Sequence, residues 1–112
     1  MKSLFILDNR EIRRQRLVQI SRATGLYDVY DSGSTSREDF EGGNFDVAIV
    51  HMSNVESPWI EDSWIEDSRN RKNAKLIIFS GGFSNDQSSA EGIEYVREKF
   101  LLENMRELIA HN

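Results

Sequence analysis

Three short apolar runs constrain the fold of this chain most strongly. Each run has four residues and is followed at once by polar residues: Leu4–Leu7, Val47–Val50 and Leu76–Phe79. Continuous runs of this length, rich in Ile, Val and Phe, are typical of strands that are buried on both faces of a parallel sheet. They are too short to span a membrane or to form the apolar core of a secretory signal.

Segments with helical periodicity separate these strands. A first helix is predicted over 10–24, ending before Gly25, with a buried stripe of Ile12, Leu17, Ile20 and Ala23. A last helix is predicted over 100–109, with the stripe Leu101, Met105, Leu108 and Ile109. Shorter helices are predicted over 36–40, from Ser57-Pro58 onward, and as one or two turns within 83–91.

Two shorter strands, over 26–30 and 92–96, complete an alternation of strands and helices. This order indicates an α/β fold in which three layers, α/β/α, are built around a five-stranded parallel sheet. A chain of 112 residues forms one domain, which we assign to residues 1–112. Ligand crevices in such sheets lie at the carboxyl ends of the strands, where this chain places Asp8, Asn9, His51, Ser80 and Glu98.

Composition excludes several classes of function. The net charge of −5 and the pI of about 5.0 argue against nucleic acid as a direct partner, because such proteins need a basic face. The chain has no cysteine, which excludes disulfides and thiol chemistry. It shows neither a signal peptide nor a membrane-spanning segment, so we expect a cytoplasmic protein with no membrane contact.

Four segments together resemble the receiver domain of response regulators, the CheY-like family of two-component signalling. They follow the family's order along nearly the whole chain: Leu4–Asn9, Phe45–His51, Leu76–Gly81 and Gly92–Phe100. The resemblance implies the flavodoxin-like version of the α/β fold. It also implies a pocket at the strand ends where the family binds Mg²⁺ and phosphorylates an aspartate.

Several residues depart from the family's pocket. The acidic pair is reduced to Asp8 and the neutral Asn9, His51 stands at the phospho-accepting position, and Glu98 stands where the family has a lysine. Asp8, Ser80 and Tyr95 match. The resemblance therefore implies a degenerate member, a pseudo-receiver, that is not an enzyme and uses no metal or cofactor. Such a module would signal by binding another protein, either a kinase or an output protein.

By the same resemblance, four residues are candidates for the interaction face: Tyr95, Arg97, Phe100 and Met105. A second copy of the chain is also a candidate partner. Two rival functions stay open, namely a sensor of a small ligand or anion in the strand-end cleft, and a phosphotransfer protein that uses His51.

Individual motifs leave alternatives open. His51 could be a hydrogen-bonded residue that fills the vacated pocket, a pH or ligand sensor, or an acid-base group. His111 is expected in the solvated tail, so one histidine without cysteines is too few for zinc. Ser80-Gly81-Gly82 could form a tight turn or an anion-binding nest.

Two further features concern the surface. A tandem repeat, Trp59–Ser63 and Trp64–Ser68, could be an acidic helix with one side on the core or an aromatic-acidic docking surface. Four arginines make the first helix basic, either as a solvated outer face or as a docking site for an acidic partner: Arg10, Arg13, Arg14 and Arg16.

Overall fold

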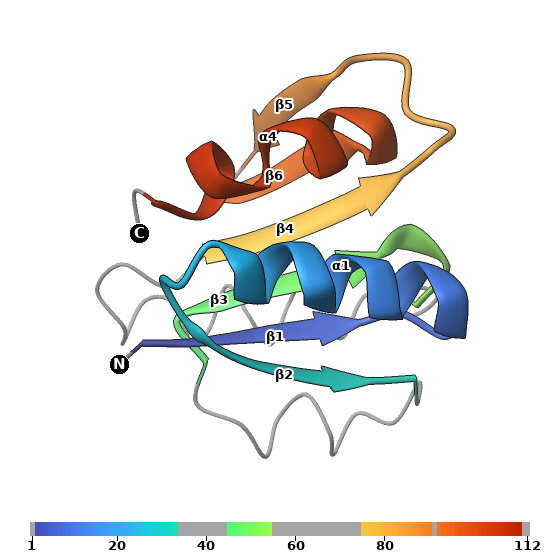
Figure 1. Ribbon diagram of the computed structural model, residues 1–112. Coiled ribbons are helices and arrows are strands. Elements are labelled where there is room, and N and C mark those ends of the chain that lie inside the picture. The colour runs from blue at the N-terminus through green and yellow to red at the C-terminus, as the bar shows by residue number, and fades with distance from the viewer. Residues whose placement is uncertain (1, 34–44, 55–74, 91, 111–112) are drawn as a thin grey trace.

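A six-stranded sheet forms the centre of the computed structural model, which describes residues 2–33, 45–54, 75–90 and 92–110. The strands are β1 (Ser3–Leu7), β2 (Asp28–Ser32), β3 (Val47–His51), β4 (Lys75–Ser80), β5 (Gln87–Ala90) and β6 (Ile93–Arg97). Their order across the sheet is β2-β1-β3-β4-β6-β5 (Figure 1). All neighbours pair in parallel except β5, which is antiparallel to β6.

The first five strands of this order match the flavodoxin-like arrangement 2-1-3-4-5, which confirms the predicted fold class. The sixth strand, β5, was not expected, and the helical turns predicted within 83–91 are wrong. Serines are weak helix formers, and Gly92 adopts φ +80°, which permits a tight turn into β6. The Arg97 N–H donates to the Asp86 carbonyl, so this polar segment pairs its main chain with β6 instead.

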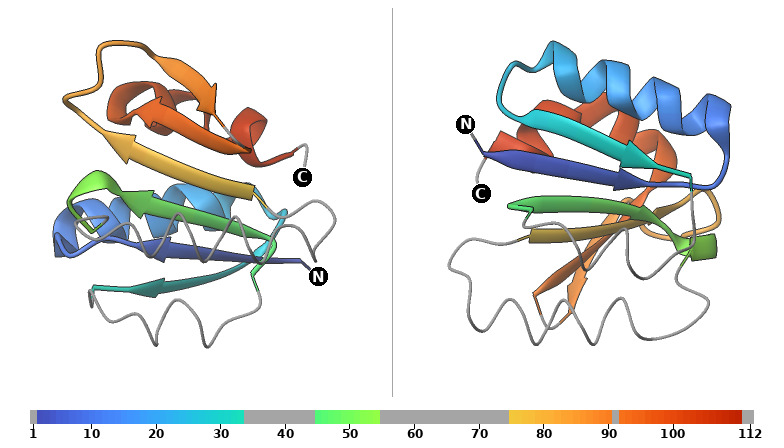
Figure 2. Two further views of the ribbon diagram at one scale, coloured as in Figure 1. Left: turned by 180° about the vertical axis from the view of Figure 1, so that it is seen from behind. Right: turned by 90° about the horizontal axis from the view of Figure 1, so that it is seen from below.

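Two α-helices, α1 (Glu11–Ala23) and α4 (Glu98–Ala110), lie side by side on one face of the sheet (Figure 2). A 3₁₀ turn, η1 (Met52–Asn54), follows β3. The predicted stripe of α4 is confirmed, because its four residues are buried. Among the described helices, none is long and apolar enough to cross a membrane. The helices predicted over 36–40 and from Ser57, and the tandem tryptophan repeat, lie outside the described residues.

Both faces of the central strands are buried, as the three apolar runs predict. Side chains alternate between two clusters. One cluster, with Leu4, Ile6 and Ile49, packs beneath α1 and α4. The other lies on the opposite face and comprises Phe5, Leu7, Ala48, Val50, Leu76, Ile78 and Ile93.

Helix α1 is rotated relative to the prediction. Ile12 is 86% exposed and Ala23 is exposed, so both are wrongly placed in the predicted buried stripe. The buried residues are Leu17, Val18 and Ser21. Arg13 and Arg14 precede Leu17 and Val18 by one helical turn and share their inward face. For these two arginines, the expected solvated outer face is therefore wrong, whereas Arg10 and Arg16 are exposed.

Candidate functional site

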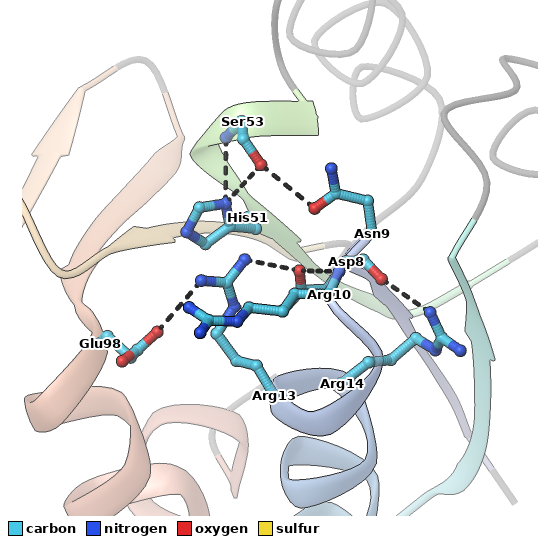
Figure 3. Close-up of polar contacts among 8 residues, drawn as sticks. All are labelled: Asp8, Asn9, Arg10, Arg13, Arg14, His51, Ser53 and Glu98. Atoms are coloured by element: carbon cyan, nitrogen blue, oxygen red, sulfur yellow. Dashed lines mark hydrogen bonds and ion pairs between the residues drawn. The ribbon is translucent and has the colours of Figure 1, made fainter.

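The predicted site residues lie at the carboxyl ends of the parallel strands. Asp8 follows β1, His51 ends β3, and Glu98 follows β6 as the first residue of α4. Figure 3 shows that Asp8 and Glu98 approach one side chain from the first turn of α1, that of Arg13. The sequence prediction did not include this arginine in the site.

Asp8 is a buried carboxylate whose charge is paired. Its side chain is 0% exposed, and Arg13 binds it with two parallel hydrogen bonds, from Nε to Oδ2 at 2.6 Å and from Nη2 to Oδ1 at 2.7 Å. The Arg10 N–H also donates to Oδ1, at 3.0 Å. Charge-assisted, two-pronged pairs of this kind are among the strongest polar contacts in proteins. Both oxygens of Asp8 are therefore already occupied.

Arg13 is the cation at the centre of the site. Its side chain is 17% exposed, its Nη1 atom lies 3.7 Å from Oε1 of Glu98, and its guanidinium carbon lies 5.8 Å from the centroid of the buried Phe79 ring. The hydrogen bonds to Asp8 are the main cause that raises the pKa of Arg13 above its ordinary value, against the opposing effect of burial. The side chain of Arg13 therefore stays positively charged.

Arg14 ties the ends of two strands together. Its Nη1 atom donates to the Asp8 carbonyl and its Nε atom to Asp31 Oδ2, each at 3.0 Å. The side chain passes so close to Gly33 that a Cβ atom at that residue would lie 2.1 Å from Nη1. Because residue 33 is glycine, the Arg14 side chain has the space to reach both Asp8, which follows β1, and Asp31 in β2.

His51 is held by Ser53 two residues later (Figure 3). The Ser53 N–H donates to Nδ1 at 3.1 Å, and Ser53 Oγ lies 2.7 Å from the same nitrogen. Because an N–H group can only donate, Nδ1 carries the lone pair and the ring proton is on Nε2. Burial, and then the charge of Arg13, lower the pKa of His51 below its ordinary value. The histidine is therefore a neutral, hydrogen-bonded part of the site.

Ser53 also links His51 to the loop after β1. Its Oγ atom also lies 3.5 Å from Asn9 Oδ1. Ser80 is used differently, because its Oγ atom accepts from the Gly82 N–H at 3.1 Å. That contact closes a turn and occupies one of the donors that an anion-binding nest would need. The structure thus joins Asp8 with Glu98 through Arg13, joins His51 with Asn9 through Ser53, and shows Ser80 in its own turn.

The candidate interaction face is built differently from the expectation. Met105 is only 2% exposed and packs in the core beneath α4, so its assignment to a surface is wrong. Tyr95 and Phe100 are half-buried. Arg97 donates to the carbonyls of Phe83 and Ser84, and therefore supports the loop that leads into β5.

The residues present do not fit Mg²⁺. This ion prefers several oxygen ligands, usually including carboxylates, in octahedral geometry. Both oxygens of Asp8 are paired with Arg13, Asn9 is neutral, and His51 offers a nitrogen. Within the described ranges, there is no group of three or more His, Cys, Asp or Glu residues that could hold a metal ion.

The sequence does hold a signal for Arg13. It lies five residues after Asp8 and four before the buried Leu17, a spacing that places an arginine on the inward face at the strand ends. Because the prediction placed the apolar Ile12 in the core, it oriented the helix with Arg13 facing solvent rather than Asp8.

Comparison with known proteins supports the fold. No protein-family model matches this sequence, and no match is found among curated proteins. Among solved structures, the chain is similar to one from Burkholderia thailandensis that carries the name of a pilus assembly protein, CpaE. The two share 12% identity with a TM-score of 0.62, over 98% of this chain and 99% of that chain. At this identity, the likeness shows the fold alone.

Proposed function

We propose that this chain is a degenerate receiver-like module that regulates another protein by binding it, without being phosphorylated. The observation that carries the proposal is the two-pronged contact of Arg13 with the buried Asp8. An internal guanidinium takes the cationic role that the receiver family gives to a metal ion. We infer a cytoplasmic setting from the acidic, cysteine-free composition.

Phosphoryl transfer to an aspartate needs a divalent cation that offsets negative charge on both the donor and the acceptor. Arg13 supplies a single charge, and Asp8 and Glu98 already face it. The accepting position holds a neutral histidine whose Nδ1 atom is engaged by Ser53. These features support a pocket with one fixed state rather than a phosphorylation switch.

The same charge arrangement disfavours the rival function of an anion sensor. An incoming anion would have to compete with Asp8 and Glu98 for Arg13, and a buried ion pair is costly to separate. A protein partner fits the surroundings better, because large apolar side chains are exposed beside the pocket residues in sequence. Ile12 precedes Arg13 and is 86% exposed, and Met52 follows His51 and is 41% exposed.

The test is incubation with acetyl phosphate and Mg²⁺, followed by intact-mass spectrometry, with an active receiver domain as positive control. We expect no mass gain on this chain. A phosphoryl gain that disappears in the His51→Ala variant would replace the proposal with histidine phosphotransfer. The binding role is tested by affinity capture from a native lysate, in which Ile12→Ser should weaken capture and Lys99→Ser, an exposed residue of α4, should not.

A further inference from the structure

Strand β5 forms an open edge of the sheet. It is last in the strand order, and within the part of the chain that the structure describes, β6 is its only partner strand. All four of its residues, Gln87 to Ala90, are exposed. Natural edge strands are commonly protected by charges, proline or bulges, because unpaired main-chain groups invite another strand. This edge has no charged residue and no proline, in a chain of which 29% is charged.

The register of the hairpin fixes which main-chain groups face outward. The Arg97 N–H donates to the Asp86 carbonyl, so residues 86 and 97 form a hydrogen-bonded pair. Hydrogen-bonded and non-hydrogen-bonded pairs alternate in antiparallel strands. Ser88 and Ala90 therefore direct their main-chain groups toward β6, opposite Tyr95 and Ile93. Gln87 and Ser89 direct theirs away from the sheet.

The outward main-chain groups of Gln87 and Ser89 are complementary to the same groups in another copy of the chain. Two residues separated by one position, each with one donor and one acceptor, can pair in antiparallel fashion with the same two residues of another copy. Gln87 then pairs with Ser89 of the second copy, and Ser89 with its Gln87. A two-fold axis passes between the two Ser88 residues. The outward groups thus match a symmetric dimer, in which the same patch serves both chains.

We propose that β5 is a homodimerisation edge, at which two copies join their sheets by antiparallel β5–β5 pairing centred on Ser88. No like charges meet along the pairing. Among the described residues beside the strand, Asp86 pairs with Arg97 at 2.9 Å and Glu94 with Lys75 at 3.4 Å within each chain. This inference does not depend on the chemistry of the Arg13 site.

A single-cysteine probe tests the register directly. Opposed residues of a non-hydrogen-bonded pair have Cα atoms about 4.5 Å apart, within the range that a disulfide bridges. Because the chain has no cysteine of its own, a disulfide in the Ser88→Cys variant must join two chains. Under mild oxidation we expect rapid covalent dimer from Ser88→Cys and little from Asp28→Cys, at the exposed start of the opposite edge strand β2. Equal rates from the two variants would overturn the proposal.

A charge exchange tests the two-fold axis without a covalent bond. Ser88→Lys and Ser88→Glu each place like charges opposite each other in the dimer, and each should be monomeric by sedimentation velocity. Mixed in equal amounts, they should form a heterodimer. The proposal is wrong if the unaltered chain stays monomeric up to about 1 mM, or if it dimerises and both variants still do so alone.

A main-chain probe completes the test. Ser89→Pro removes an outward N–H and leaves the groups of Ser88 and Ala90 that pair with β6. We expect loss of the dimer with a retained cooperative melting transition. A Ser89→Pro variant that melts cooperatively and still dimerises would place the interface elsewhere. If this variant fails to fold, the Ser88 variants decide.

Discussion

At the scale of single residues, the pair of Arg13 and Asp8 dominates the site. A carboxylate that is removed from water is stable only if its charge and its lone pairs are satisfied. Arg13 satisfies both oxygens of Asp8, and the Arg10 N–H adds a third donor. The pair therefore has a structural role in addition to occupying the pocket.

Removing the arginine should destabilise the fold strongly. Arg13→Met leaves the buried Asp8 carboxylate without its counter-charge, which should lower the free energy of unfolding by about 3 kcal/mol. Arg16→Met, an exposed arginine of the same helix, should change it by less than about 0.5 kcal/mol. Urea unfolding of the two variants makes the comparison. Equal small losses in both would show that the Asp8 contact contributes little.

His51 gives the protein a weak dependence on acid. Its pKa is lowered in the folded state from the ordinary value of 6.5, chiefly by burial. The unfolded chain therefore binds the proton more readily, and this histidine's contribution to stability is complete above pH 6.5 and is lost as the pH falls through the folded-state pKa. His51→Asn should reduce the loss of stability from pH 7 to about pH 5. An unchanged pH profile in urea unfolding would contradict this account.

At the scale of elements, a glycine in left-handed conformation follows the end of α1, and another precedes the start of β6. Gly25 follows α1 with φ +68°, and a Cβ atom there would meet nothing within 4 Å. Gly25→Ala should therefore cost about 1 kcal/mol through backbone strain alone. Gly81→Ala is the matched control, because it has equal space without a positive φ, and should be nearly neutral. Similar thermal shifts in the two variants would remove the strain argument.

Elements that bury a clear pattern of apolar side chains could be predicted well from the sequence. The three apolar runs became β1, β3 and β4, and the four-residue stripe of α4 is buried as expected. Elements that depend on pairing rather than on apolar patterning could not. Strand β5 consists of exposed residues, and only its ladder with β6 makes it a strand. The predicted buried face of α1 was wrong because an ion pair between Arg13 and Asp8, rather than an apolar residue, anchors the first turn of the helix.

At the scale of the whole molecule, fold and site follow from the same topology. The strand order brings the loops after β1, β3 and β6 to one edge, so the positions of Asp8, His51 and Glu98 could be predicted from the sequence. The state of that site could not, because it depends on a side chain from α1. The added strand β5 lies at one edge of the sheet, next to β6, and gives this receiver-like fold an edge for strand pairing.

We propose that Arg13 stands in the place that a metal ion takes in the receiver family. Restoring the carboxylates of that family's pocket is then not enough to create a Mg²⁺ site. The measurement is the melting temperature with and without millimolar Mg²⁺, at ionic strength matched with NaCl, since an ion that binds only the native state raises it. The chains compared are the unaltered protein, the double variant Asn9→Asp/His51→Asp, and this double variant with Arg13→Met.

We expect Mg²⁺ to leave the unaltered chain and the double variant unchanged, because Arg13 still occupies both oxygens of Asp8. With Arg13→Met added, the three carboxylates lose the guanidinium that occupies Asp8, and Mg²⁺ should raise the melting temperature clearly. A clear rise in the unaltered chain, or an equal rise in the double variant with Arg13 in place, would contradict the claim.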